Sequence, residues 1–470
     1  MNISEFFILL RQELVITLII FILLFLKLGR ERSNNGLLVL INILLLVNFA
    51  YGFCCDTSGS LFSDMFHTDK LVALEKNILN LAMLIISLQA YNWLQTHKHV
   101  TEFYILLLTT LLGMFFMISS GHLLMFYLGL EMSTIPLAAA ANFDLHKKQS
   151  SEAAMKLIIS SAFSSALLLL GISLVYGATG RLELTALSSM LGTQPLHIFA
   201  FILLLSGFAF KISAVPFHLW TADVYEGAPV AVTAYLSVVS KAAVLFVFVS
   251  VLYTVFRPLA VDWYPMLMIL ALLTIIIGNL FALRQQNIKR FLAFSSIAQV
   301  GFILVGISGA SQTGSASVIF FILVYVFSNL GAFGVVALVT ALTGRENIDD
   351  YRAFYRNNRF LSWTLTIALF SLAGVPPAAG FFGKFFLLMS GASRGHYAFI
   401  AVAALNMVIS FYYYLRIVKA IFMDDNAQPI EPLPVAVMPK LALYICLAGV
   451  IVTGLWSYLY DYIFSLSPIF

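Results

Sequence analysis

Long runs of apolar residues, separated by short polar connections, make up almost the whole chain. A helix needs about 20 consecutive apolar residues to cross the hydrocarbon core of a membrane. Because backbone polar groups find no water partners in lipid, helices are the spans that this pattern favours. The pattern predicts about fourteen transmembrane helices, near residues 6–28, 36–55, 72–94, 102–119, 121–142, 153–178, 195–219, 228–253, 263–283, 288–309, 315–342, 360–390, 396–422 and 438–463.

The composition agrees with this pattern. Hydrophobic residues account for 61% of the 470 positions and charged residues for only 10%, whereas soluble domains carry about 25% charged residues. The formal net charge of +4 is too small to indicate a nucleic-acid partner. We therefore predict an all-α polytopic membrane protein without a separate soluble domain.

The cysteines do not form a metal-binding motif. Cys54 and Cys55 are adjacent, and Cys446 lies inside a distant apolar run. Structural zinc sites and iron–sulfur clusters need paired cysteines at characteristic spacings, such as CxxC. We interpret the three as small packing residues and predict neither a metal nor a redox cofactor in this chain. Any redox cofactors would then lie in partner chains.

The basic residues of the loops predict an orientation, because cytoplasmic loops are rich in Lys and Arg. One set of alternate loops contains Lys27, Arg30, Arg32, Lys98, Lys147, Lys148, Arg284, Lys289, Arg290, Arg345, Arg352, Arg356, Arg359, Arg416, Lys419 and Lys440. The other set holds little beyond Lys70, Arg181, Arg257 and Arg394. The first set is expected to be cytoplasmic, so that both termini lie on the opposite, periplasmic side.

Four ionisable residues lie deep inside predicted spans, where a charge costs roughly 3 kcal/mol on insertion scales. They are Glu131, Lys211, Lys241 and Lys384. Burial destabilises the charged form of lysine, and a nearby carboxylate restores it, whereas arginine stays charged. A buried lysine can therefore take up and release a proton when the local field changes. We predict a proton relay through these four residues, with Glu131 as the charge partner of Lys211.

Prolines interrupt two of the predicted spans beside these lysines. Pro216 follows Lys211, while Pro376 and Pro377 precede Lys384. Proline removes a backbone donor and clashes with the preceding helical turn. The backbone groups freed by such a break are tolerated at membrane depth only beside protein or water. The two breaks therefore predict hydrated surroundings for the neighbouring lysines.

The two broken stretches also indicate an internal repeat. "FKISAVPF" (210–217) and "FSLAGVPP" (370–377) share Phe, Val and Pro, and they are five predicted helices apart. An odd offset implies an inverted repeat, a common arrangement in transporters. We expect N-terminal helices over 1–100, a first repeat over 101–255, a second over 256–425, and a C-terminal helix over 426–470.

Three further residues have both a structural and a functional interpretation. Lys156 lies four residues after Glu152, which favours an ion pair on a helix, although it is also a candidate for the relay. His218 either caps a helix after the first break or relays protons. Gln299 hydrogen-bonds water in a channel or simply contacts another helix.

Three stretches of the sequence resemble a known family. They are "FKISAVPFHLWTADVYEGAPVAVTAYLSVVSKAA" (210–243), "NIKRFLAFSSIAQVGF" (287–302) and "LAGVPPAAGFFGKF" (372–385). They are similar to the signature of the N subunit family of respiratory complex I, the proton-translocating NADH–quinone oxidoreductase. The resemblance covers most of the chain and is weakest in the first three predicted helices and the last. Gln299 stands where some members have histidine, and Ala222 where many have proline.

The resemblance implies a fourteen-helix, antiporter-like subunit without its own redox cofactor. It implies that NAD, FMN, iron–sulfur clusters and quinone are bound by partner subunits. The neighbours would be other antiporter-like subunits and small membrane subunits in a bacterial inner membrane. It assigns the family's proton-transfer roles to Glu131, Lys211, Lys241 and Lys384, the four residues already selected by their burial.

Two other functions remain to be weighed against this one. A subunit of a cation/proton antiporter complex would need carboxylates near the midplane to bind sodium, because hard cations prefer oxygen ligands. Glu131 alone qualifies among the four, so the lysines favour protons. A structural spacer without transport is disfavoured by the cost of four buried charges.

Overall fold

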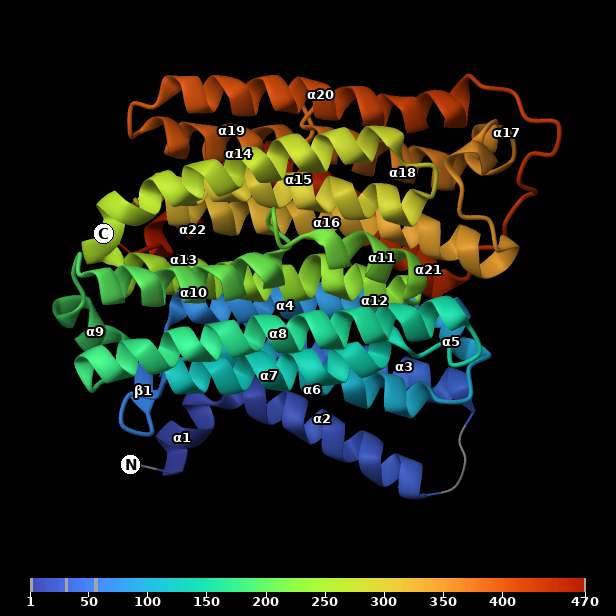
Figure 1. Ribbon diagram of the computed structural model, residues 1–470. Helices are drawn as coiled ribbons and strands as arrows, with labels where there is room; N and C mark the ends of the chain where they lie inside the picture. The colour runs from blue at the N-terminus through green and yellow to red at the C-terminus, as the bar shows by residue number, and fades with distance from the viewer. Residues whose placement is uncertain (1–2, 30–32, 55–57, 469–470) are drawn as a thin grey trace. The chain divides into compact units, whose positions relative to one another are not determined.

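The computed structural model describes residues 3–29, 33–54 and 58–468, and this part of the chain is mostly helical (Figure 1). The prediction of an all-α membrane protein is confirmed. Within the described residues, eleven helical stretches are long and apolar enough to cross a membrane. The expected number of about fourteen spans stays a prediction. Arg30, Arg32 and Cys55 lie outside the described residues.

The helices of the first part of the chain follow the predicted apolar runs. In chain order they are α1 (Ile3–Leu9), α2 (Arg11–Leu28), α3 (Asn34–Tyr51), α4 (Lys70–Gln89), α5 (Tyr91–Gln95), α6 (Val100–Ile118), α7 (Leu123–Ala141), α8 (Lys148–Thr179), α9 (Leu184–Met190) and α10 (Pro195–Ile212). A small antiparallel hairpin of β1 (Gly59–Leu61) and β2 (Phe66–Thr68) precedes α4. This hairpin was not expected from the sequence, because strands of three residues leave no periodic signal.

The second part continues with shorter and longer helices. They are α11 (Leu219–Gly227), α12 (Val230–Tyr235), the π-helix η1 (Leu236–Ser240), α13 (Lys241–Thr254), the 3₁₀ turn η2 (Arg257–Leu259), α14 (Ala260–Arg284), α15 (Ile288–Ser308), α16 (Gln312–Thr343), the 3₁₀ turn η3 (Ile348–Tyr351), α17 (Phe354–Asn357), α18 (Arg359–Ala373), α19 (Ala379–Ala392), α20 (Tyr397–Phe422), α21 (Val437–Leu455) and α22 (Tyr458–Leu466).

The chain forms two compact units. The first comprises Met1–Leu84, Leu94–Ile212 and Val239–Met266, and the second comprises Ile85–Trp93, Ser213–Val238 and Leu267–Phe470. The domain boundaries expected from the sequence remain a proposal.

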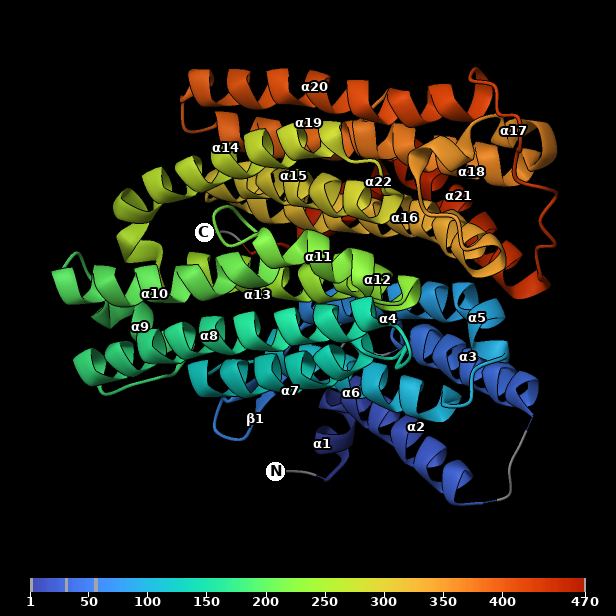
Figure 2. The ribbon, with the colours of Figure 1, turned by 45° about the vertical axis from the view of Figure 1, so that its right-hand side comes forward.

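Small residues bring α6 and α7 close together in the first unit. Figures 1 and 2 both show α6, α7 and α8 side by side. A Cβ atom on Gly113 would lie 2.6 Å from the backbone nitrogen of Ser133, and one on Gly129 would lie 2.7 Å from that of Met117. Such small residues let membrane helices approach until their backbones touch. The contacts also place residues 113–117 of α6 level with residues 129–133 of α7.

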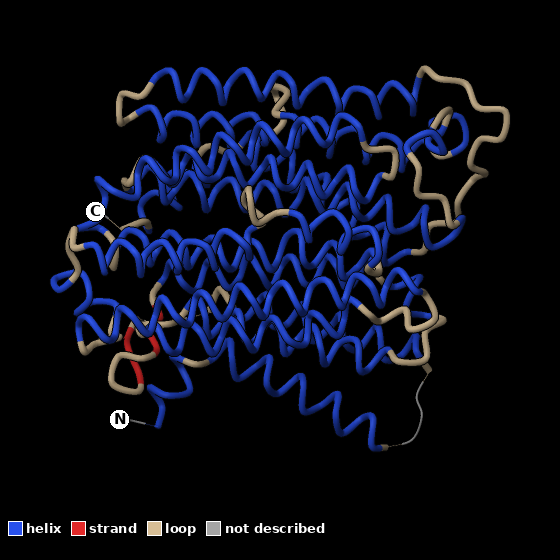
Figure 3. The backbone as a smooth tube through the Cα atoms, viewed as in Figure 1, coloured by secondary structure: helices blue, strands red, loops and turns tan. Residues whose placement is uncertain are grey.

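The two breaks expected from the prolines are present. Helix α10 ends at Ile212 and α11 begins at Leu219, so that Pro216 lies between them. Helix α18 ends at Ala373 and α19 begins at Ala379, with Pro376 and Pro377 between them. Gly374 ends α18 in a left-handed conformation, with φ of 84°, which glycine adopts without steric cost. Figure 3 shows this second break as a loop partway along the neighbouring helix α20.

Other predicted spans need correction. The runs 6–28, 72–94 and 438–463 were expected to be single helices, but turns interrupt them at Leu10, Ala90 and Trp456. The run 228–253 contains the π-helix η1 in its middle. The hydropathy of a residue indicates its preference for lipid but not its backbone conformation. The residues at each interruption are as apolar as their neighbours, so the apolar run shows no sign of the break.

Candidate functional site

Glu131 and Lys211 approach each other in the first unit without touching. Glu131 lies near the middle of α7, and its Oε1 atom is buried without a hydrogen-bond partner among the described residues. Lys211 belongs to the last turn of α10 and not to its middle, because the helix ends at Ile212. The two charges interact electrostatically, but no direct ion pair joins them within the described residues.

Two hydroxyl groups hold the ammonium of Lys211. Its Nζ atom donates to Thr134 Oγ1 at 2.8 Å and to Ser161 Oγ at 2.6 Å. Thr134 lies on α7 three residues after Glu131, so both side chains occupy the same face of the helix. Thr134 therefore contacts the amine from the helix face that also carries Glu131. The Thr134 hydroxyl accepts from Lys211 and donates its own hydrogen to the carbonyl oxygen of Leu130 at 2.7 Å.

Lys241 occupies an unusual point in the backbone. It is the first residue of α13 and follows the π-helix η1 directly, and its side chain is only 2% exposed. Short π-helical turns are frequent at functional sites, because the wider turn alters backbone hydrogen bonding locally. In the second unit, Ser237, four residues earlier, accepts a hydrogen bond of 2.6 Å from Asn329 Nδ2.

Lys384 is completely buried at the second break. Its Nζ atom donates to the carbonyl oxygens of Leu372 at 2.7 Å and Ala373 at 3.2 Å. These carbonyls belong to the last turn of α18, which has no further helical turn to donate to them. The C-terminal end of a helix also carries partial negative charge, which favours a cation. The ring of Phe302, 4.8 Å from Nζ, adds a cation–π contact.

Gln299 belongs to the same polar group as Lys384. Its Nε2 atom donates to Leu372 O at 2.9 Å and to the hydroxyl of Tyr414 at 3.1 Å. The Tyr414 hydroxyl in turn lies 2.5 Å from Ser295 Oγ. Gln299 Oε1 is buried without a partner among the described residues. The amide thus links the broken helix to a tyrosine–serine pair and keeps one acceptor unused.

Comparison with known proteins identifies the family. The profile of the family described as "NADH:quinone oxidoreductase/Mrp antiporter, TM" matches residues 120–410, more than half of the chain. Subunit N of NADH-quinone oxidoreductase from Phocaeicola vulgatus is 45% identical over 406 residues, covering 86% of this chain and 86% of that protein. The chain belongs to the subunit N family of NADH-quinone oxidoreductase. Its antiporter-like fold and its membrane location follow from this membership.

Solved structures agree with the family. A chain of respiratory complex I from Thermus thermophilus matches with a TM-score of 0.82 and 27% identity, covering 96% of this chain and 98% of that one. A chain of the Mrp complex from Dietzia sp. matches with a TM-score of 0.82 over 97% of both chains. At 18% identity, the second match shows the shared fold alone.

Lys156 and His218, two further candidates in this subunit N family member, have different surroundings. Lys156 forms the predicted ion pair with Glu152 at 2.7 Å, and both side chains are exposed to a large extent. His218 lies after the first break, is 7% exposed, and has a buried Nδ1 atom without a partner among the described residues. Their part in proton transfer, like that of Gln299, remains a proposal.

A charge cluster fixes the end of α11 in the second unit. Arg290 Nη1 contacts Asp223 Oδ1 at 2.8 Å and Glu226 Oε2 at 2.7 Å. Lys289 contacts Glu346 at 2.9 Å. All of these residues except Glu346 belong to two of the stretches that resemble the family. The cluster ties α11, the helix that follows the first break, to the start of α15.

The hydrogen-bonding partners of the lysines carry no signal in the sequence. Thr134, Ser161, Tyr414 and Ser295 are ordinary polar residues in apolar helices, and no spacing marks them as neighbours of a charge. The prolines predicted that a helix break frees backbone carbonyl groups, but not that the carbonyl groups of α18 accept hydrogen bonds from Lys384. Among the described residues, no group of three or more His, Cys, Asp or Glu side chains is placed to hold a metal ion.

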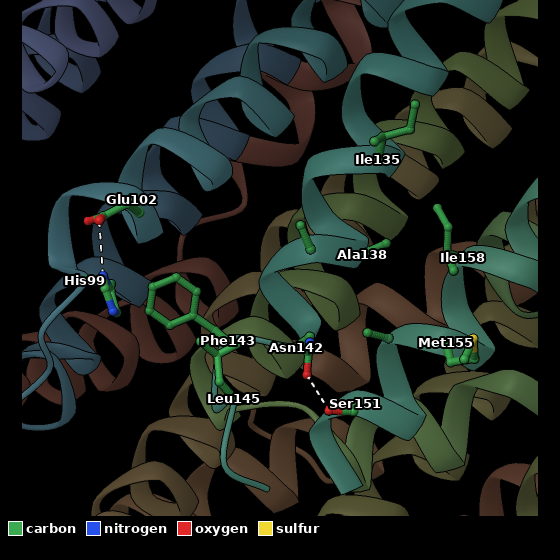
Figure 4. Close-up of a pocket in the computed structure, with 12 residues that line it drawn as sticks. His99, Glu102, Ile135, Ala138, Asn142, Phe143, Leu145, Ser151, Met155 and Ile158 are labelled. Carbon is green, nitrogen blue, oxygen red and sulfur yellow. Dashed lines mark hydrogen bonds and ion pairs between the residues drawn. The ribbon is translucent and has the colours of Figure 1, made fainter. Parts of the chain in front are cut away.

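A separate groove of about 750 Å³ lies between α6, α7 and α8 (Figure 4). Its apolar wall includes Ile135, Met155 and Ile158. Figure 4 shows two polar contacts at its edge, Glu102 with His99 and Asn142 with Ser151. None of the four lysine and glutamate relay candidates lines this groove, so we assign it no part in the site.

Proposed function

We propose that this chain translocates protons as a non-redox membrane subunit of a proton-pumping NADH–quinone oxidoreductase. Protons move along the relay of Glu131, Lys211, Lys241 and Lys384. The observation that carries the proposal is the full burial of Lys384 against the open end of a broken helix, with Gln299 and Tyr414 beside it. A group that carries protons must be able to gain and lose its charge. Lys384 meets this requirement, because the groups that bind its ammonium are neutral carbonyl oxygens and not a carboxylate.

The electrostatic logic favours a relay over isolated sites. Two unit charges 4 Å apart interact by about 4 kcal/mol at an effective dielectric constant near 20. A change of about 1.4 kcal/mol alters proton binding tenfold. When a lysine passes its proton to water, its amine becomes neutral and the neighbouring carboxylate loses a compensating charge. The proton affinity of each group therefore depends on the charge of the next.

The energy for this movement comes from outside the chain. Quinone reduction takes place in neighbouring subunits, which bind NAD, FMN, iron–sulfur clusters and quinone. The partners are other antiporter-like subunits and small membrane subunits of the same complex. The chain lies in a bacterial inner membrane, and the distribution of Lys and Arg supports an orientation with both termini on the periplasmic side. The inverted repeats, 101–255 and 256–425, each contribute one broken helix.

Replacing the lysines one at a time tests the proposal. Lys211→Ala, Lys241→Ala and Lys384→Ala should each reduce NADH–quinone turnover and proton pumping in membrane vesicles by about tenfold or more. Phe385→Ala serves as a control, because Phe385 adjoins Lys384 but is 46% exposed. A structural spacer would retain pumping after all three changes.

A subunit of a cation/proton antiporter complex is the second candidate. The family profile includes Mrp antiporters, and the fold matches one of their complexes. This function predicts that vesicles containing the chain exchange sodium for protons without NADH or quinone. Exchange that persists without redox substrates and is lost in Glu131→Gln would favour the antiporter.

A further inference from the structure

A second group of buried polar residues lies outside the relay, on the N-terminal helices α2, α3 and α4. Glu13 and Lys76 form an ion pair of 2.5 Å, and their side chains are 3% and 1% exposed. Neither residue is among the candidates from the sequence, although each stands within an apolar run. The pair therefore raises the same question as the relay residues do: why apolar helices bury charge.

Stability alone is a weak explanation for this pair. Removing two charges from water is costly, and replacing a buried ion pair by apolar residues of similar size is often neutral or stabilising. Aromatic rings cover the amine: its Nζ atom lies 5.0 Å from the ring centroid of Phe66 and 5.9 Å from that of Phe115. These rings favour the cation but cannot accept its proton.

The polar side chains around the pair have more hydrogen-bonding atoms than protein partners. Gln12, Asn77 and Asn80 are at most 2% exposed. Gln12 Nε2, Glu13 Oε2, both side-chain polar atoms of Asn77, and Asn80 Nδ2 have no partner among the described residues. Buried polar groups that lack protein partners are normally satisfied by internal water.

Contacts between the helices bring these residues together. Asn48 Nδ2 on α3 donates to Asn80 Oδ1 on α4 at 2.7 Å. A Cβ atom on Gly52, just after α3, would lie 2.2 Å from Asn77 Oδ1, so the Asn77 amide packs directly against this glycine. The ion pair joins α2 to α4. The unpartnered atoms named above therefore belong to α2 and α4, which the ion pair joins, and Asn48 connects α3 to the same stretch of α4.

The pair also lies close to the level of Glu131 along the helices of the first unit. Close contacts place residues 113–117 of α6 level with residues 129–133 of α7. Phe115, whose ring covers the amine of Lys76, belongs to this level. The ion pair and Glu131 are thus at a similar level in the first unit.

We propose that Glu13 and Lys76, with Gln12, Asn77 and Asn80, form an internal water site in which the ion pair exchanges a proton with bound water. This inference rests on the proposed function, to which it adds a second place of proton exchange. A proton that crosses the contact breaks the Lys76 Nζ–H bond and forms a bond to Glu13 Oε1, leaving both groups neutral. The O–H bond of the Glu13 carboxyl group then breaks as bound water takes this proton and becomes hydronium, and the hydronium gives a proton back to the neutral amine of Lys76, which restores the ion pair and the water.

A paired apolar replacement separates this site from a structural ion pair. Glu13→Leu together with Lys76→Met removes both charges and keeps the volume approximately. We expect the complex to assemble, while NADH-driven pumping and quinone turnover fall about fivefold or more. Wild-type pumping in this double variant would overturn the inference. Ile16→Leu with Met83→Leu, a volume-conserving change at buried positions of the same helices, should leave pumping unchanged.

X-ray radiolytic footprinting of the wild-type complex tests the water directly and needs no variant. Bound water generates hydroxyl radicals that label adjacent side chains, so Phe66 and Phe115 should be labelled although both are fully buried. Phe103, which is equally buried, should stay unlabelled. The absence of label on both Phe66 and Phe115 would overturn the inference, and it decides the matter if the double variant fails to assemble.

Lys241→Ala, measured in the same preparations, distinguishes failure of this inference from failure of the proposed function. If Lys241→Ala abolishes pumping and the apolar pair does not, the relay stands and the second site falls. If Lys241→Ala pumps normally, the proposed function fails, and the footprint alone still reports whether water occupies the site.

Discussion

Lys384 and Gln299 donate to one and the same acceptor, the carbonyl oxygen of Leu372, at 2.7 Å and 2.9 Å. This oxygen is available because α18 ends at Ala373 and provides no amide one turn further on. The break in the helix therefore supplies what a buried ammonium needs, an oxygen acceptor without a full negative charge. A carboxylate in its place would hold the proton more firmly.

Lys384→Met should separate proton transfer from packing. Methionine has a similar length and is apolar, so the completely buried site stays filled. Leu372 O keeps its bond from Gln299. We expect the complex to assemble and pumping to fall about tenfold or more, measured as proton uptake by vesicles per NADH oxidised. Normal pumping in this variant would remove Lys384 from the relay.

Gln299→Leu and Gln299→His should behave differently. Leucine removes the donor shared by Leu372 O and Tyr414, and the loss of each buried hydrogen bond costs about 1 kcal/mol. We expect lower thermal stability and slower turnover. Histidine restores a donor and adds a group that titrates, so its turnover should approach that of the wild type. Equal damage from both changes would mean that Gln299 contributes by its shape alone.

Glu131→Gln tests whether a charge acts at a distance. Lys211 binds hydroxyl groups, with no direct ion pair to Glu131 among the described residues. Removing the carboxylate charge should therefore lower turnover by about tenfold or more without weakening assembly. Glu131→Asp keeps the charge and should retain most of the activity, as should the control Met132→Leu. Loss of activity in Glu131→Asp comparable to that in Glu131→Gln would argue for a direct contact instead.

Gly380→Ala should disrupt the second break. An added Cβ would lie 1.7 Å from the carbonyl oxygen of Ser371 and 3.1 Å from its hydroxyl, so α19 would have to move away from α18. We expect a loss of about 1–3 kcal/mol or more in stability, seen as a lower yield of assembled complex. Gly177→Ala on α8 meets no atom within 4 Å and should assemble normally. Normal assembly of Gly380→Ala would show that the junction is loosely packed.

The hairpin before α4 should depend on pH through His67. A hydrogen bond to Asp69, 3.4 Å long, raises the pKa of His67 above its usual value, although burial opposes this. The folded pKa exceeds the unfolded value near 6.5. The stabilising contribution of protonated His67 to the hairpin is therefore complete below about pH 6.5 and is lost as the pH rises through the pKa of the folded state.

His67→Gln should then accelerate hydrogen–deuterium exchange of residues 59–68 at about pH 5.5 and not at about pH 8.5. The change in the free energy of opening the hairpin should be less than about 1 kcal/mol, because the side chains of His67 and Asp69 are both partly exposed and solvent weakens such pairs. An equal effect at both pH values would exclude the protonated histidine as its cause.

The sequence identified the charged residues of the site but not their partners. Glu131, Lys211, Lys241 and Lys384 stood out because charge in an apolar run is costly wherever the helix lies. Thr134 and Ser161 did not stand out, because a hydroxyl in a membrane helix satisfies itself on the preceding turn, as Thr134 does with Leu130 O at 2.7 Å. Their contact with Lys211 depends on how α7, α8 and α10 pack.

The fold, like the site, divides into features that the sequence determines and features that depend on helix packing. Apolar length and the prolines determine where helices form and where two of them break, since both are local properties of the backbone in lipid. Tertiary structure alone decides which free carbonyl faces Lys384, where the π-helix places Lys241, and that Glu13 meets Lys76 across 63 residues. These contacts join residues far apart in the chain, and a local pattern carries no information about the helix packing that creates them.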